Sequence, residues 1–96
     1  MNSVVIDGRS VCRLRPGWRL QWEETQQRHV LLYPEGMVQL NDTAGAILAQ
    51  LDGQRDVEAV IAILQAHYPE APAAAIAEDV HEFMIDAAQQ GWILHD

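Results

Sequence analysis

The feature that most constrains this chain is a short helix with clear signals at both ends, in residues 40–53. Asn41 or Asp42 can cap its N-terminus by accepting a backbone N–H. Gly53 suits a left-handed position after its end. The spacing i, i+3, i+4, i+7 places four apolar residues on one buried face, namely Ala44, Ile47, Leu48 and Leu51. The pattern predicts a helix over residues 42–51 that acts as scaffold, because it contains no nucleophile, metal cluster or phosphate loop.

Three short strands are predicted before this helix. Trp18, Leu20 and Trp22 alternate with polar residues, which predicts a strand near 19–23 with one buried face. The nearly continuous apolar run at 29–33 is typical of a strand that is covered on both faces or lies centrally in its sheet, and it predicts a strand near 28–33. A Pro-Glu-Gly turn follows, and then a strand of about four residues at 37–40, a length typical of a sheet edge. The spacing predicts an antiparallel meander.

Two further helices are predicted after it. Asp56 is a good N-cap for a helix over 56–67, and Gly91 closes a longer helix over 73–90. The apolar residues 92–94 are expected to fold back on the core. Residues 1–15 have no convincing period and are interpreted as an arm that can be flexible, before a single domain over 16–96. The fold class is therefore α+β, with a three-stranded antiparallel N-terminal sheet followed by a three-helix bundle.

The helix at 73–90 carries two adjacent apolar stripes. One consists of Ile76, Val80, Phe83 and Ala87, and the other of Ala73, Ala77, Met84 and Ala88. This face is wider than a single packing contact requires. Either both stripes belong to the core, or the second one forms the floor of a groove.

Charge is distributed unevenly along the 96 residues, whose net charge is −8. Residues 41–96 hold one arginine and ten acidic residues, and the chain has no lysine. This acidic half repels phosphate backbones, which argues against nucleic acid as a partner. It favours a basic partner surface or serves solubility alone. The single cysteine, Cys12, forms no internal disulfide, and no apolar run is long enough for a membrane span, so we expect a cytoplasmic protein.

Residues that carry chemistry are scattered. His29, His67, His81 and His95 do not show the spacing of metal ligands, and Cys12 has no CxxC partner. The adjacent carboxylates at 23–24 and 78–79 point to different faces of their elements, so they make poor acid–base pairs. We expect no catalytic residues, no metal and no cofactor.

Several segments together resemble one family, PqqD of pyrroloquinoline quinone biosynthesis. The resemblance covers about residues 15–94 and rests on 19–23 (RLQWE), 29–36 (HVLLYPEG), 40–44 (LNDTA), 47–48, 52–53 and Val57. It implies a winged-helix-like domain that recognises ribosomally made precursor peptides and is not itself catalytic. Such a domain binds the precursor peptide PqqA and presents it to the radical S-adenosylmethionine enzyme PqqE.

The resemblance also implies that the peptide adds as a strand beside the third strand, against the third helix. An edge strand independently favours this, because strand addition uses its unpaired backbone groups. We expect the peptide to contact Tyr33, Met37, Val38, Gln39, Leu40, Ala77, Val80, His81 and Met84. The same edge would permit a homodimer. A small pathway enzyme acting on a quinone precursor is an alternative that lacks a catalytic constellation, and a winged-helix DNA-binding regulator is disfavoured by charge.

Overall fold

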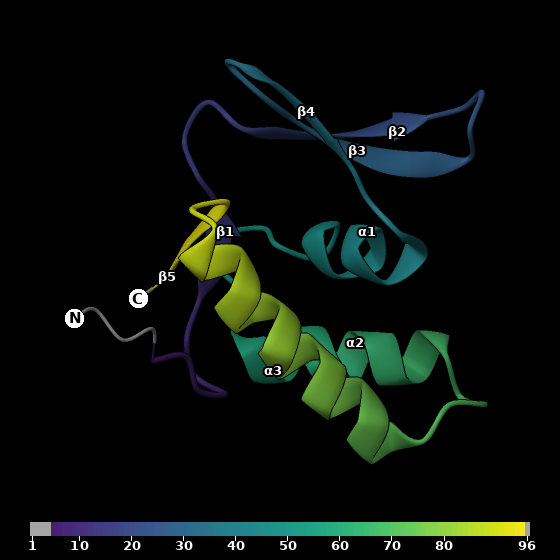
Figure 1. The fold of residues 1–96 in the computed structure, drawn as a ribbon. Coiled ribbons are helices and arrows are strands. Elements are labelled where there is room, and N and C mark those ends of the chain that lie inside the picture. Colours follow the sequence, from purple (N-terminus) through teal and green to yellow (C-terminus); the bar gives the residue numbers. More distant parts are fainter. Residues whose placement is uncertain (1–4, 96) are drawn as a thin grey trace.

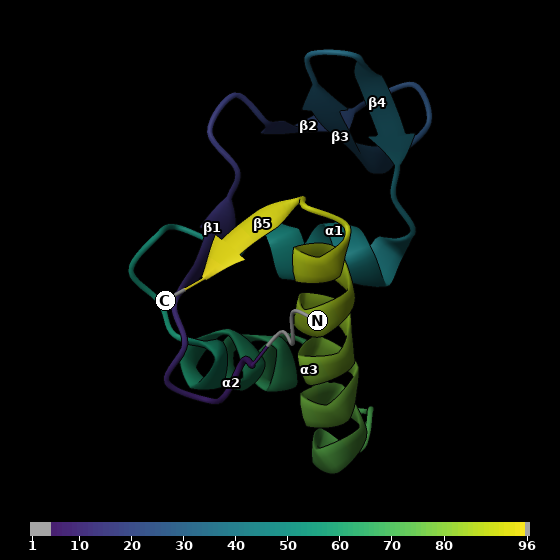
Figure 2. The ribbon, with the colours of Figure 1, turned by 60° about the vertical axis from the view of Figure 1, so that its left-hand side comes forward.

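The computed structural model describes residues 5–95, which form an α+β fold with two small sheets and three helices (Figure 1). In both views α1 lies between the three-stranded sheet and the other two helices (Figures 1 and 2). The elements in chain order are β1 (Cys12–Leu14), β2 (Arg19–Glu23), β3 (Arg28–Tyr33), β4 (Gly36–Gln39), α1 (Asp42–Leu48), α2 (Val57–His67), α3 (Ala73–Gln89) and β5 (Ile93–His95).

The larger sheet is the predicted antiparallel meander, with strand order β2-β3-β4. Its register pairs Leu20 with Leu31 and Leu31 with Val38, so these three side chains share the face that packs on the core. The prediction that β3 is covered on both faces is confirmed. Val30 and Leu31 are adjacent residues of β3, so their side chains point to opposite faces, and they are 2% and 0% exposed.

Helix α1 approaches the sheet closely because it carries a glycine where it meets β3. Gly45 is buried, and a Cβ placed on it would lie 2.6 Å from Nδ1 and 3.1 Å from Cβ of His29. The imidazole in turn packs edge-on against the indole of Trp22, with ring centroids 5.0 Å apart. The glycine therefore sets the distance between helix and sheet.

Gly45→Ala is expected to destabilise the fold, although alanine is the better helix former. Alanine gains about 1 kcal/mol in helix propensity, but overpacking typically costs about 1–3 kcal/mol, and the closest approach is to the imidazole ring of His29, which is packed against the indole of Trp22. Urea denaturation measures the net loss. The matched background is His29→Ala, in which the same substitution should become stabilising. Stabilisation in the wild-type background would contradict the close packing.

The ends of α1 differ in part from the prediction. Asn41 is the N-cap, and its Oδ1 accepts the Ala44 N–H at 2.8 Å. The helix ends at Leu48, earlier than predicted, because the next N–H groups donate to carbonyls only three residues back, from Gln50 to Ile47 and from Leu51 to Leu48. Such bonds tighten the last turn out of α-helical geometry. Gly53 is left-handed as predicted, with φ +80°, but it lies in the loop beyond this turn.

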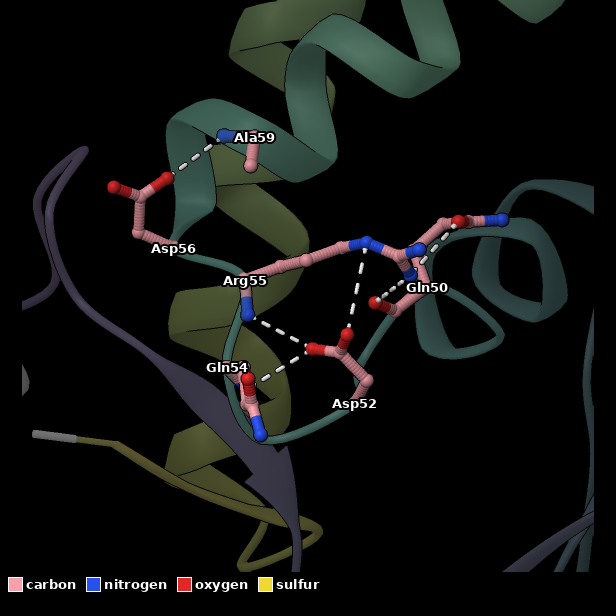
Figure 3. A network of polar contacts seen from close by, with 6 residues as sticks. All are labelled: Gln50, Asp52, Gln54, Arg55, Asp56 and Ala59. Carbon is pink, nitrogen blue, oxygen red and sulfur yellow. Dashed lines mark hydrogen bonds and ion pairs between the residues drawn. The ribbon is translucent and has the colours of Figure 1, made fainter.

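The loop between α1 and α2 is held by one aspartate and one arginine (Figure 3). The Asp52 Oδ1 accepts the backbone N–H groups of Arg55 at 2.8 Å and Gln54 at 2.9 Å, and these bonds lower the pKa of the carboxyl below its ordinary value. The Arg55 guanidinium donates to the carbonyl of Gln50 at 3.1 Å. Asp56 then caps α2 as predicted, accepting the Ala59 N–H at 2.8 Å.

The predicted fold was incomplete at its two ends, where β1 and β5 form a second antiparallel sheet. Cys12 and Ile93 in these strands are 1% and 2% exposed, and Ile6 also joins the core. The expected return of the C-terminal segment to the core is thus confirmed, whereas β1 within the predicted arm was missed. A three-residue strand whose partner is about 80 residues away in sequence leaves no local pattern.

Candidate functional site

The strand β4 forms one edge of the larger sheet, and within residues 5–95 it pairs only with β3. The Leu40 N–H donates to the carbonyl of His29 on β3 at 3.1 Å. Because successive backbone groups alternate in direction along an antiparallel strand, the N–H of Val38 also faces β3. The N–H and C=O groups of Met37 and Gln39 therefore face away from the sheet, where another strand can pair with them.

The side chains of this edge differ in accessibility. Met37 is 54% exposed, and Gln39 is exposed with its Oε1 accepting from Nη1 of Arg28 at 3.4 Å. Val38 is half-buried against the core, and Leu40 is only 3% exposed. Of the predicted β4 contacts, Met37 and Gln39 are thus the accessible ones, while Leu40 is a core residue.

Tyr33, the predicted contact on β3, is half-buried and stacks on the tryptophan that directly precedes β2. Its ring centroid lies 4.7 Å from that of Trp18, with an angle of 18° between the planes. The stack covers the sheet at the β3–β4 turn. Tyr33 therefore supports the edge from the core-facing side.

A hollow of about 240 Å³ lies between α1, the end of α2 and the first half of α3. A second hollow extends from the end of β4 and shares one residue with it, Asp42 at the start of α1. Asp42 therefore borders both hollows. The first hollow is lined by Asp42, Thr43, Ala46, Ile47, Leu64, Tyr68, Ala71, Ile76, Asp79 and Val80.

Of the four residues predicted on α3, only Val80 lines this hollow. Met84 is fully buried at 0% exposure, which corrects the interpretation that its stripe lies outside the core. Ala77 and His81 are half-buried and do not line the hollow. The structure instead brings Ile76 and Asp79 to it.

The prediction from the sequence omitted these two residues, because the two apolar stripes on this helix do not reveal which side of α3 borders a cavity. The buried line of the helix runs through Val80, Met84 and Ala87. Ile76 and Asp79 lie on one side of that line, and Ala77 and His81 on the other, as the helical spacing of 100° per residue requires. Only the position of α1 distinguishes the two sides.

Between residues 5 and 95, no three or more His, Cys, Asp or Glu side chains lie close enough to hold a metal ion. In the same range no helix has the length and apolar character needed to cross a membrane.

Comparison with known proteins gives the family. The family model for coenzyme PQQ synthesis protein D (PqqD) matches residues 28–93, from β3 through β5. The chain belongs to the PqqD family. The PqqA binding protein of Klebsiella pneumoniae strain 342 is 54% identical over 84 residues, which cover 88% of this chain and 89% of the relative. PqqA binding protein 1 of Pseudomonas putida is 47% identical and covers 93% of this chain and 96% of the relative.

Two solved PqqD structures are also similar. The solution structure of the PqqD truncation of Methylobacterium extorquens PqqCD, described as a stand-alone RiPP recognition element, has a TM-score of 0.78 at 34% identity. The match covers 94% of this chain and 95% of the Methylobacterium extorquens chain. The crystal structure of PqqD from Xanthomonas campestris has a TM-score of 0.52 at 34% identity, with 80% and 84% covered. The β4 edge and the hollow thus lie within the region that matches the PqqD family model.

Proposed function

We propose that this protein binds the precursor peptide PqqA by strand addition at β4. The observation that carries the proposal is the free edge at Met37 and Gln39, whose backbone groups point away from the sheet, and Gln39 also lines the second hollow at the end of β4. An extended peptide at such an edge gains affinity from main-chain hydrogen bonds and specificity from pockets for its side chains. The names of the relatives as PqqA binding proteins support the choice of peptide.

We further infer that the domain is a winged-helix-like recognition element that carries the peptide and performs no chemistry on it. The description of the Methylobacterium extorquens relative as a stand-alone recognition element supports this role. In this interpretation PqqE is the enzyme that receives the bound peptide. Pairing of two copies through β4 would use the same backbone groups, so a homodimer would compete with the peptide.

We assign fewer residues of β4 to the peptide than the sequence suggested. Met37 and Gln39 contact its main chain and nearest side chains. Ile76 and Asp79 of α3 border the hollow that receives a further side chain, and Val80 forms part of its floor. Tyr33, Leu40 and Met84 position the site from within the fold.

An NMR titration of the labelled protein with synthetic PqqA tests the proposal. The largest amide shifts are expected at 37–39 and at the residues lining the hollow, and calorimetry on the same samples gives the dissociation constant. Shifts confined to α2 and the β1–β5 sheet would contradict strand addition at β4. Catalytic turnover by the purified protein alone would contradict the carrier role.

Two tryptophan substitutions decide which side of α3 the peptide occupies. Ala46→Trp places an indole in the hollow from α1, and it is expected to abolish PqqA binding with little loss of stability because Ala46 borders open space. Ala77→Trp is the matched control on the opposite side and should retain binding. Calorimetry measures binding, and a thermal melt measures stability. If only Ala77→Trp loses binding, the peptide lies on the Ala77 side of α3, as the sequence predicted.

A further inference from the structure

The hollow between α1, the end of α2 and α3 is apolar at its floor and acidic at its rim. Ile47, Leu64 and Val80 are core residues at its floor. Its volume of about 240 Å³ is below the range of roughly 300–1,000 Å³ typical of small-molecule sites. Such a cavity matches a single side chain of a peptide better than a cofactor-sized ligand.

Two carboxylates on different helices border this hollow, Asp42 at the start of α1 and Asp79 on α3. Both residues are exposed. Within residues 5–95, neither side chain has a hydrogen-bond or ion-pair partner, and the hollow is lined by no lysine, arginine or histidine. A carboxylate at Asp42 is favoured by the helix N-terminus alone, but Asp79 lies well inside α3 and has no such explanation.

Tyr68 at the end of α2 adds an aromatic ring to the same rim and is 43% exposed. A cation next to such a ring gains a further electrostatic attraction. An apolar floor, two carboxylates without partners and an exposed ring together match a basic residue adjacent to an apolar one.

We propose that Asp42 and Asp79 determine specificity by pairing with one Lys or Arg of the bound peptide, whose neighbouring apolar side chain fills the hollow. This inference rests on the proposed function and specifies the chemistry of its peptide. Charge complementarity at a rim selects partners and speeds association more than it adds affinity. The two carboxylates would thus fix the register of the peptide along β4.

Calorimetry with synthetic PqqA, the wild type and three asparagine variants tests this inference. Asp42→Asn and Asp79→Asn are each expected to weaken binding about 2–5-fold, and the double variant about 10-fold, as for exposed ion pairs. Asp86→Asn is the matched control, because Asp86 is also exposed on α3 but does not line the hollow. Its effect should stay below about 1.5-fold, and raising the salt concentration should reduce the effect of the first two variants.

A peptide series identifies the paired residue. Each Lys and Arg of PqqA is replaced singly by Gln, and one of these peptides should bind the wild type and Asp79→Asn equally. Equal weakening by Asp79→Asn and Asp86→Asn, or no peptide that couples to either carboxylate, would overturn the inference while leaving PqqA binding intact. Absence of wild-type binding would instead overturn the proposed function, and this inference with it.

Discussion

Gln39→Pro is expected to weaken PqqA binding about 10-fold or more while the domain stays folded. The Gln39 N–H faces away from β3, so proline removes a donor that only an added strand would use. Leaving the opposing acceptor of the peptide unpaired costs about 1–3 kcal/mol, and about 1.4 kcal/mol is a factor of ten in affinity. Calorimetry measures the loss, and far-UV circular dichroism checks the fold.

Two neighbouring variants serve as controls for this experiment. Gln39→Ala keeps the backbone donor and removes only the contact with Arg28, so it should bind nearly as wild type. Val38→Pro removes a donor that faces β3 and should destabilise the sheet itself. Normal binding by a folded Gln39→Pro protein would exclude strand addition at this position.

Leu48→Ala is expected to have the largest effect on stability, about 2–5 kcal/mol, as a large-to-small change in a closed core. Leu48 is 2% exposed and belongs to α1, the helix that lies between the larger sheet and α2 (Figure 1). Leu51→Ala is the comparison, because Leu51 belongs to the same predicted stripe but is only half-buried and should cost less. Urea denaturation measures both, and a loss well under about 1 kcal/mol for Leu48→Ala would remove it from the core.

Much of the fold was predictable because its signals are local. The alternation of β2, the apolar run of β3 and the cap at Asp56 each act over a few residues, and all three elements occur where predicted. The predicted buried face of β2 is wrong at Trp22, which is 46% exposed. The early end of α1 depends on how the last turn tightens. The pairing of β1 with β5 joins segments at opposite ends of the chain, and the sequence carries no local signal for it.

The site was predictable only as far as the edge strand. A four-residue strand after a turn identified β4, and the direction of its donors followed once the partner of Leu40 was known. The prediction for α3 was wrong at Met84, because a methionine within a stripe of alanines suggests an open groove as readily as a core. Burial of this side chain and the position of α1 distinguish the two.

The β1–β5 sheet also determines where attachments to this domain emerge. By pairing residues 12–14 with 93–95, it brings a strand from the first part of the chain beside the last described residues, at one pole of the molecule. In both views this pole lies opposite the start of α1, where the hollow and the end of β4 are found (Figures 1 and 2). One similar structure is a truncation of a longer PqqCD chain. A domain attached beyond β5 would therefore emerge away from the face that we propose for the peptide.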